Sequence, residues 1–367
     1  MYFVNDNFLD KKINGIKEGG IVRNIAWIDF LKAHFPNTKF IDMKITNKIF
    51  KHIHYVWLFI ISFFIYKDTF FFLYPRVGMP ILNKGIRGKI YRKTFLIILK
   101  NLCKRKNSVI IDISDIKYEQ AIDLELSNLD MQEIKHFEEA LFSMDLKFVF
   151  ASYSMREYAV KKHNIQIDKT CVCINGGFIP DDCKDTNFDF LNEQNKIKYV
   201  YAGTLNKGRM IEEMIDAFPD DDKYYLILLG SSGEWINDYI VKSKKSNIKY
   251  LGAFEEKTAR TIVSMCDVGL IPYDDSRLYY NIAYPTKLSF YIAAGIPFLS
   301  TPVSEVKLVL SKYDVGFSNK ISDWKDFITS TTKENLLEKK QKISDFKHKF
   351  TWNEIFRNCD FLKDRNV

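Results

Sequence analysis

The feature that most constrains this chain is a regular alternation of short apolar segments with longer helical ones, which runs through the sequence twice. In the first half, strand-like segments such as 70–74 and 109–113 stand between amphipathic stretches such as 21–34 and 131–142. Strands that alternate with helices of this length pair in parallel, because each crossover helix returns the chain to the same end of the sheet. We therefore expect an α/β protein with Rossmann-like, doubly wound sheets.

A polar stretch separates the two halves. Residues 180–196 (PDDCKDTNFDFLNEQNK) interrupt the alternation, which restarts at Lys198. A chain of 367 residues also exceeds the size at which one hydrophobic core usually continues to grow. We predict one domain over residues 1–180 and a second over 197–350. Two such domains would form a cleft at the carboxyl ends of their strands, where open α/β sheets bind ligands.

The charge balance indicates an anionic partner. The formal net charge is +8, which favours contact with a nucleotide, a phospholipid surface, a lipid pyrophosphate or a nucleic acid. The sequence contains no signature of a nucleic-acid-binding module, so we expect no nucleic-acid partner.

The six cysteines are scattered along the sequence, without CxxC spacing or a neighbouring histidine cluster. We therefore expect no metal site and no disulfide framework, but buried thiols in a reducing cytoplasm. The opening MYFVNDNF lacks the basic and apolar regions of a secretory signal.

Two segments raise the question of membranes. Residues 55–65 (YVWLFIISFFI) form an apolar run that is too short to span a bilayer, and we expect a buried helix there. Residues 85–106 combine an apolar stripe with many Lys and Arg residues. This pattern is typical of a helix resting on an anionic membrane surface, but equally of an ordinary helix with a solvated basic face.

The first strand is not followed by GxGxxG, which argues against a dinucleotide-dependent dehydrogenase. Instead, Gly19 and Gly20 lead into a helix near Ile21. A glycine pair at a helix start allows close backbone approach by an anion, here a donor sugar or an acceptor group. A flexible connection between strand and helix explains the pair as well, and both interpretations stay open.

Three strand ends of the second half carry candidate nucleotide contacts. In YAGTLNKGR, a glycine permits a tight turn, and the basic residues that follow are placed to contact a phosphate. LLGSSGE offers small hydrogen-bond donors for a nucleoside or a phosphate. YLGAF offers backbone hydrogen bonds and an aromatic edge for a base. The predicted diphosphate contacts here are Gly203, Thr204, Lys207 and Arg209, and the predicted nucleoside contacts are Gly230, Ser231, Ser232, Ala253, Phe254 and Tyr273.

The segment IPYDDSRLYYNIAYPTKLSFYIAAGIP is the strongest single signal. Pro285 and Thr286 precede a helix that begins near Lys287, so helix-end amides and an ammonium group would meet at one point. This arrangement predicts a diphosphate site at Thr286 and Lys287. The tyrosines of the segment also fit a packed core. Nearby candidates for contact with a donor sugar or an acceptor are Asp274, Tyr280 and Asn281.

In this order, these motifs resemble the nucleotide-binding domain of GT-B glycosyltransferases related to family 4. The form PTKLSFY over residues 285–291 looks most like a bacterial group that contains galactofuranosyltransferase-like and adhesin-glucosyltransferase enzymes. The opening MYFVND and the strand IIDISD are similar to that group too. Residues 351–367 resemble the final helix of the fold, which crosses back to the N-terminal domain.

The resemblance implies an enzyme that moves a hexose from a nucleotide-diphosphate sugar, with UDP as the expected nucleotide, to an oligosaccharide or lipid-linked acceptor bound by the N-terminal domain. It implies bacterial surface polysaccharide or glycoconjugate synthesis in the cytoplasm, with peripheral contact at the inner membrane face, and self-association. No cofactor or metal is expected, because Lys207 or Arg209 and Lys287 would neutralise the leaving diphosphate.

One position departs from the family pattern. Many family 4 enzymes carry a glutamate where this chain has Phe290, and that glutamate holds the donor ribose. The departure leaves stereochemistry open and keeps a non-catalytic scaffold in view. The rival enzyme is a nucleotide-sugar epimerase with the same two-domain plan. For a base that activates the acceptor hydroxyl, the candidates are Asp112 and Asp115 in IIDISD, with helix capping or loop hydrogen bonds as the alternative role.

Overall fold

The computed structural model describes residues 1–5, 19–42, 48–75, 79–126, 130–181, 188–206, 209–231 and 233–363. The chain divides into two compact units. The first consists of Met1–Ile13, Gly20–Ile174 and Phe356–Val367, and the second of Asn14–Gly19 and Asn175–Ile355. Lys207 and Ser232, two of the predicted site residues, lie outside the described residues.

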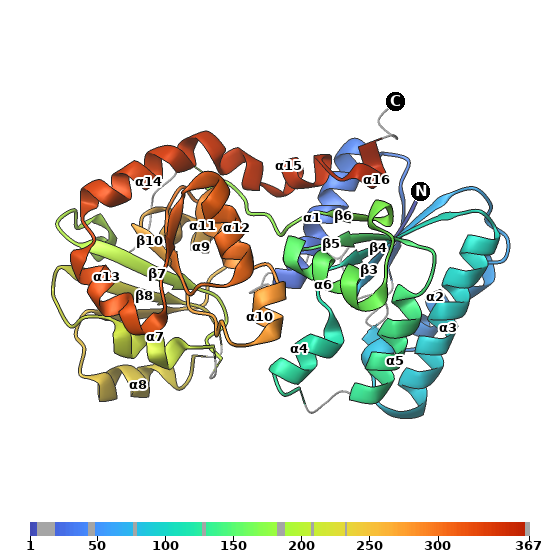
Figure 1. Ribbon diagram of the computed structural model, residues 1–367, viewed down its shortest axis with the longest axis horizontal. Helices are drawn as coiled ribbons and strands as arrows, with labels where there is room; N and C mark the ends of the chain where they lie inside the picture. The colour runs from blue at the N-terminus through green and yellow to red at the C-terminus, as the bar shows by residue number, and fades with distance from the viewer. Residues whose placement is uncertain are drawn as a thin grey trace. The chain divides into compact units, whose positions relative to one another are not determined.

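The first unit is built on a parallel six-stranded sheet in the order β2-β1-β3-β4-β5-β6 (Figure 1). The central strand β3 is buried at every residue of its sequence TFFFLY, as expected for a strand covered on both faces. The strands are β1 (Tyr2–Asn5), β2 (Lys39–Asp42), β3 (Thr69–Tyr74), β4 (Ser108–Ile113), β5 (Lys147–Phe150) and β6 (Thr170–Val172).

Helices connect these strands. They are α1 (Gly19–His34), α2 (Lys48–Ile61), α3 (Gly85–Lys104), α4 (Lys117–Asp123), α5 (Met131–Phe142) and α6 (Tyr153–His163), with the short α16 (Asp360–Lys363) near the C-terminus. Trp27 of α1 stacks on Phe356 with ring centroids 3.6 Å apart. This contact joins the C-terminal segment to the first unit.

The second unit contains a parallel sheet in the order β12-β11-β10-β7-β8-β9. Its strands are β7 (Ile197–Ala202), β8 (Tyr224–Leu229), β9 (Ile248–Gly252), β10 (Val268–Ile271), β11 (Phe298–Ser300) and β12 (Gly316–Ser318). The chain starts in the middle of the sheet, runs outward through β8 and β9, and returns to the other side of β7 at β10. The strand order therefore reverses between β7 and β10, which is the topological switch point of a Rossmann-like sheet.

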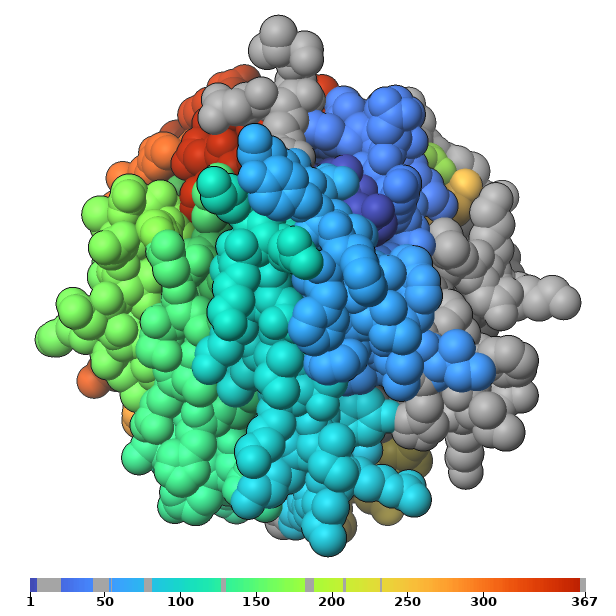
Figure 2. All heavy atoms as spheres, turned by 90° about the vertical axis from the view of Figure 1, so that its right-hand side faces the viewer, coloured from blue at the N-terminus to red at the C-terminus, as the bar shows by residue number. Residues whose placement is uncertain are grey.

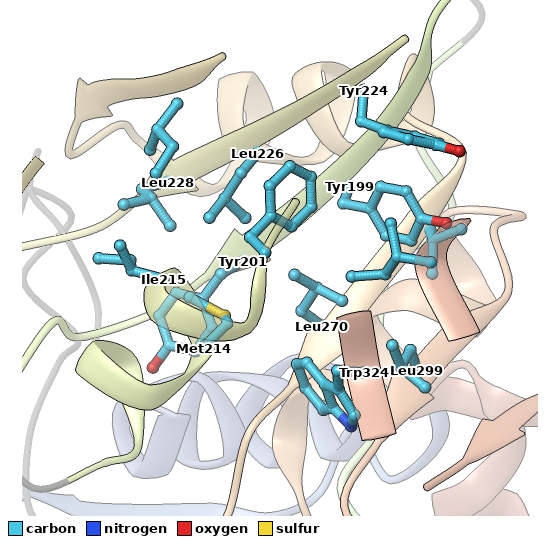
Figure 3. Close-up of a cluster of buried hydrophobic side chains, with 14 of the residues drawn as sticks. Tyr199, Tyr201, Met214, Ile215, Tyr224, Leu226, Leu228, Leu270, Leu299 and Trp324 are labelled. Carbon is cyan, nitrogen blue, oxygen red and sulfur yellow. The ribbon is translucent and has the colours of Figure 1, made fainter. Parts of the chain in front are cut away.

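The helices of the second unit are α7 (Ile211–Ala217), α8 (Ile236–Ser243), α9 (Glu256–Ser264), α10 (Leu278–Ile282), α11 (Thr286–Ala293), α12 (Ser304–Tyr313), α13 (Trp324–Ser330) and α14 (Lys333–Phe346). Helix α15 (Trp352–Arg357) begins in this unit and ends in the first. Figure 3 shows part of the core beneath them, where Tyr199 and Tyr201 of β7 pack with Leu226, Leu270 and Trp324. Tyr199 and Tyr201 are two residues apart in β7, so both side chains point to the same face of the sheet.

The predicted α/β class with two Rossmann-like sheets is confirmed.

The expectation of a buried helix over residues 55–65 is wrong in one respect. Only one face of α2 is buried, through Tyr55 and Leu58, whereas Val56 and Trp57 are exposed. Among the described residues, no helix combines the length and the apolar character needed to cross a membrane.

Candidate functional site

The predicted diphosphate residues that the structure describes gather at the switch point of the second unit. Gly203 follows β7, Tyr273 follows β10, and α11 begins at Thr286. The first amide groups of an α-helix have no intrahelical partner and carry the positive end of its dipole. This end of the sheet therefore presents donors and positive charge where Rossmann-like sheets bind their ligands.

Two glycines allow the ends of β7 and β8 to approach each other closely. A Cβ atom on Gly230 would lie 1.7 Å from the carbonyl oxygen of Gly203, so no larger residue fits there without backbone movement. The Gly203 amide donates to the Leu229 carbonyl at 2.9 Å, and the Gly230 amide to the Gly252 carbonyl at 2.8 Å. The glycines thus keep the strand ends bare of side chains.

The Lys287 side chain lies against Gly203, where a Cβ atom would come within 2.8 Å of its ammonium nitrogen. The residue is only 5% exposed. Its ammonium group faces the rings of Tyr201, at 4.8 Å, and Tyr273, at 5.3 Å from the ring centroids. Burial lowers the pKa of Lys287, and the nearby Arg209 lowers it further, although Tyr201 opposes the shift. No acidic residue among those described contributes to this shift.

Arg209 is the second cation of the site. Its guanidinium donates to the Thr204 hydroxyl at 3.5 Å, a long hydrogen bond. Burial acts to lower the pKa of Arg209, but the surrounding tyrosines, chiefly Tyr273 and Tyr201, outweigh it, so the pKa is raised. Two cations with aromatic rather than carboxylate neighbours can neutralise an incoming diphosphate, because no carboxylate in the described part of the chain competes for them.

Tyr280 carries an unpartnered polar atom beside these cations. Its ring stacks on that of Tyr273 with centroids 4.7 Å apart. Its hydroxyl is buried and has no hydrogen-bond partner among the described residues. A buried hydroxyl without a partner is unusual in proteins, so Tyr280 is a strong candidate for contact with a ligand oxygen.

Asp274 and Asn281, the other predicted sugar contacts, are engaged within their own loop. Asp274 accepts hydrogen bonds from the Ser276 hydroxyl at 2.6 Å and from Arg277 Nε at 3.0 Å. Burial alone would raise the pKa of Asp274, but these hydrogen bonds outweigh it and lower the pKa. The Asn281 amide donates to the Asp275 carbonyl at 2.6 Å. Both side chains stabilise the turn before α10, and their role toward a sugar stays a prediction.

The predicted nucleoside contacts lie at the ends of β8 and β9. Ser231 is half-buried, and its carbonyl accepts the Leu205 amide at 2.8 Å. Ala253 and Phe254 are half-buried after β9, and the Phe254 ring meets Phe188 edge-on at 6.0 Å. Their role in base binding stays a prediction.

Gly19 and Gly20 begin α1, as the sequence indicated, and their ligand contact is likewise a prediction.

Asp112, a predicted catalytic base, is held inside the first unit. Its two carboxylate oxygens accept hydrogen bonds from Arg23, at 2.8 Å from Nε and 2.5 Å from Nη2, and both side chains are buried. Burial raises the pKa of Asp112, and the Arg23 guanidinium works in the opposite direction. This geometry favours the structural alternative for Asp112, and its role as a base stays a prediction.

Asp115, the other predicted base, lies in the half-buried loop between β4 and α4. Nearby, Glu138 of α5 accepts hydrogen bonds from the Tyr74 hydroxyl and the Lys117 amide, each at 2.7 Å. Burial raises the pKa of Glu138 to about 7. Sequence reasoning missed Glu138, because a glutamate within an amphipathic helix normally indicates a solvated face.

Two residues of the second unit were also missed. Tyr201 supplies a ring beneath Lys287 and donates to the Thr204 carbonyl at 2.9 Å. Thr301 accepts the Tyr273 amide at 3.0 Å and so positions that ring. A tyrosine inside a strand, such as Tyr201, normally indicates a core residue. Only its position near the carboxyl end of β7, the first strand of the second unit, could have indicated a place in the site.

The cysteines are less scattered than the sequence suggested. Cys171, Cys173 and Cys359 are buried, and their sulfur atoms all lie within 4.8 Å of one another. The sulfur atoms of Cys171 and Cys359 are 3.9 Å apart. Three sulfur atoms this close together could hold a metal ion, so the structure contains a candidate metal site that the sequence spacing did not suggest, and the expectation of no metal site stays a prediction. Sequence spacing could not reveal this, because the third thiol comes from the far end of the chain.

Residues 199–359 match the family described as glucosyltransferase 3-like, C-terminal domain. Among solved structures, HepE from Anabaena in complex with UDP-glucose is similar, with a TM-score of 0.66 at 11% identity over 99% of both chains. WaaG, a glycosyltransferase involved in lipopolysaccharide biosynthesis, has a TM-score of 0.62 at 12% identity over 98% of both chains. A glycosyltransferase from Rickettsia africae has a TM-score of 0.57 at 12% identity, over 100% of this chain and 97% of that one. No curated protein sequence matches the chain.

Proposed function

We propose that this chain, which has the GT-B fold of glycosyltransferases and a C-terminal half matching the glucosyltransferase 3-like family, transfers a hexose from a UDP-sugar to a carbohydrate acceptor. The observation that carries the proposal is the buried Lys287 ammonium, which lies beside Gly203 at the start of α11 with tyrosine rings as its neighbours. A cation in this position has an obvious use, which is to bind a diphosphate.

The chemistry of sugar transfer fits this arrangement. As the bond between the sugar and the diphosphate breaks, positive charge develops on the sugar and negative charge on the departing phosphate oxygen. The Lys287 ammonium, the Arg209 guanidinium and the first amides of α11 would stabilise that negative charge. Because the site is largely buried, each of these interactions is stronger than it would be in water. We propose that they do so without a metal ion.

The choice of UDP rests on the structural neighbours. HepE from Anabaena has been solved with UDP, with UDP and glucose, and with UDP-glucose. The small residues Gly230 and Ser231, together with Ala253 and Phe254, would line the nucleoside position. We assign the acceptor to the first unit and place the reaction in bacterial surface polysaccharide or glycoconjugate synthesis, by analogy with the stated role of WaaG.

The two rivals predict different products. An epimerase would use acid and base groups around one bound sugar and would release that sugar without an acceptor. A scaffold would bind the nucleotide without turnover, and the half-buried Phe290, in the place of the family's glutamate, keeps that alternative in view. The cations and the unpartnered Tyr280 hydroxyl favour the transferase over the scaffold.

The test is isothermal titration of UDP, GDP, CMP and NAD, each with and without an attached sugar where one exists, into the wild type and Lys287→Met. A matched control is Lys198→Met, which removes a buried lysine that donates to the Glu193 carbonyl at 2.6 Å, near the opposite end of β7. We expect UDP to bind the wild type and the control, and Lys287→Met to lose at least about tenfold in affinity, the equivalent of one charge-assisted hydrogen bond.

Turnover separates the three functions. Incubation with UDP-glucose should release UDP, faster when an acceptor glycan is present, and NMR of the sugar identifies transfer, hydrolysis or epimerisation. Absence of binding to any nucleotide at millimolar concentration would overturn the transferase proposal. Tight UDP binding without turnover on any acceptor would favour the scaffold.

A further inference from the structure

The outer face of α2 exposes a continuous row of large apolar side chains. The residues recur at helical spacing, and the row continues into the turn that follows the helix. Trp57 is 45% exposed and Phe64 75%. The row consists of Ile53, Val56, Trp57, Ile60, Phe63 and Phe64. A contiguous apolar surface of this kind marks an interaction site more often than a scattered set of single exposed residues does.

The opposite face of α2 is firmly packed, so its outer face is a genuine surface of the first unit. The Tyr55 hydroxyl donates to the Tyr91 carbonyl of α3 at 2.9 Å, and the two rings meet edge-on at 4.7 Å. Farther along, the Asn101 amide donates to the Ser62 hydroxyl at 3.3 Å. Helices α2 and α3 therefore lie side by side, and Figure 2 looks onto the side of the first unit that carries them.

Helix α3 adds a second exposed stripe, which mixes isoleucine with lysine. Its members recur at intervals of three or four residues, so they share one face of the helix. They are Ile86, Ile90, Lys93, Ile97, Lys100 and Lys104. We call the exposed residues of both helices the α2–α3 face. Long lysine side chains can lay their apolar stems along such a surface while the ammonium groups reach outward.

The charge around this face has one sign. Residues 48–106 contain thirteen Lys or Arg and a single acidic residue, Asp68. Asp68 forms an ion pair with the chain's amino terminus at 3.0 Å. Lys89 and Arg92 turn toward Glu133 of α5, at 3.6 and 3.3 Å. Lys93, Lys100 and Lys104 of the exposed stripe form no ion pair with another described residue.

We propose that the α2–α3 face docks on an anionic membrane surface. The exposed aromatic and aliphatic side chains would enter the boundary between headgroups and acyl chains, and the lysines would contact lipid phosphates. Trp57 suits this boundary, because indole rings favour membrane–water interfaces. Such docking needs no membrane-spanning helix, and it would bring the first unit to an acceptor carried by a lipid.

A second copy of this chain fits the face less well. In a symmetric dimer the same patch occurs on both sides, so the lysines of one copy would approach those of the other. The described part of the face contains no acidic residue to pair with them. Apolar side chains ringed by unneutralised cations match an anionic lipid surface, which supplies both an apolar layer and negative charge.

The test is flotation of the full chain with vesicles of pure phosphatidylcholine and with vesicles that also contain phosphatidylglycerol. We expect binding only to the anionic vesicles, weakened by salt. The double variant Trp57→Glu/Phe64→Glu should lower binding at least about tenfold, since two large apolar side chains no longer insert. Lys93→Glu/Lys100→Glu should lower it at least about tenfold, since two favourable charges become unfavourable.

Val241→Glu is the matched control, because Val241 is 76% exposed on α8 of the second unit. It should leave vesicle binding unchanged, and circular dichroism should show all variants folded. Equal binding to both kinds of vesicle, or retained binding by the two face variants, overturns the proposal. If ultracentrifugation without lipid shows an oligomer that the face variants convert to a monomer, and vesicles do not bind, the occupant is a second copy instead.

Discussion

The ammonium nitrogen of Lys287 lies 4.8 Å from the ring centroid of Tyr201, at the carboxyl end of β7. An aromatic ring stabilises a buried ammonium group less than a carboxylate would. Keeping the Lys287 charge buried therefore lowers the stability of the folded protein. Costs of this kind concentrate at functional sites, where the bound ligand offsets them. A nucleoside diphosphate would supply the missing negative charge.

Replacing Lys287 by methionine should therefore separate stability from binding. Methionine has a similar length and no charge, so Lys287→Met should raise the free energy of unfolding without ligand by on the order of 1 kcal/mol. Urea titration measures this change. Stabilisation of the wild type by UDP should disappear in the variant. A loss of more than about 2 kcal/mol would instead mean that the ammonium group stabilises the fold.

The glycine contact beneath the site makes a second prediction. Alanine at Gly230 would place its Cβ atom 1.7 Å from the Gly203 carbonyl oxygen, so β7 and β8 would have to separate. We expect Gly230→Ala to cost at least about 3 kcal/mol of unfolding free energy, because overpacking against backbone cannot relax through side-chain rotation. It should also weaken UDP binding.

Gly252→Ala is the comparison for this experiment. Gly252 has a φ of +81° but nothing within 4 Å of the position that a Cβ atom would occupy. It should cost only the backbone strain, roughly 1 kcal/mol. Equal losses for the two variants would show that positive φ, rather than the contact between strand ends, decides the effect.

The fold could be predicted because its signals are local. The buried strand β3, with its run of phenylalanines, and the helix start at Pro285 and Thr286 are each visible within a few residues. The position of Lys287 at a helix start could be predicted for the same reason, because it is visible without the rest of the chain, and its role toward a diphosphate stays a prediction. The order of these signals then indicated the GT-B fold.

What could not be predicted depends on contacts between distant residues. Arg23 and Asp112 are 89 positions apart, and Cys171 and Cys359 are 188 apart. Asp112 at the end of β4 looked like a possible base, because the arginine that pairs with it lies far away in the sequence, on α1. The exposure of Trp57 was missed similarly, since an apolar run shows no outer face until the helix is packed.

The buried pair of Arg23 and Asp112 leads to a third prediction. Asp112→Asn should cost about 3–5 kcal/mol of unfolding free energy, because the buried Arg23 guanidinium loses the negative charge of the Asp112 carboxylate. The double variant Arg23→Met/Asp112→Leu should recover much of that loss, because neither charge remains. Urea titration of both variants measures the two changes. An Asp112→Asn protein of normal stability that had lost only transfer activity would support the catalytic role instead.

Glu138 links stability to pH. Burial raises its pKa in the folded protein to about 7, from an ordinary value of 4.5. Between these two pH values the unfolded chain releases the proton while the folded chain keeps it, so this residue's contribution to stability falls as pH rises from 4.5 to about 7 and is constant above. The full change is on the order of 3 kcal/mol. Urea titrations between pH 5 and pH 8 should show a steeper decline for the wild type than for Glu138→Gln.

Glu139→Gln is the control for this last prediction, because Glu139 is the next residue along α5 and is exposed. It should keep the wild-type slope. Since glutamine cannot lose a proton, parallel slopes for Glu138→Gln and the wild type would mean that Glu138 is already ionised at pH 5. In that case its hydrogen bonds from Tyr74 and the Lys117 amide would outweigh the cost of burial.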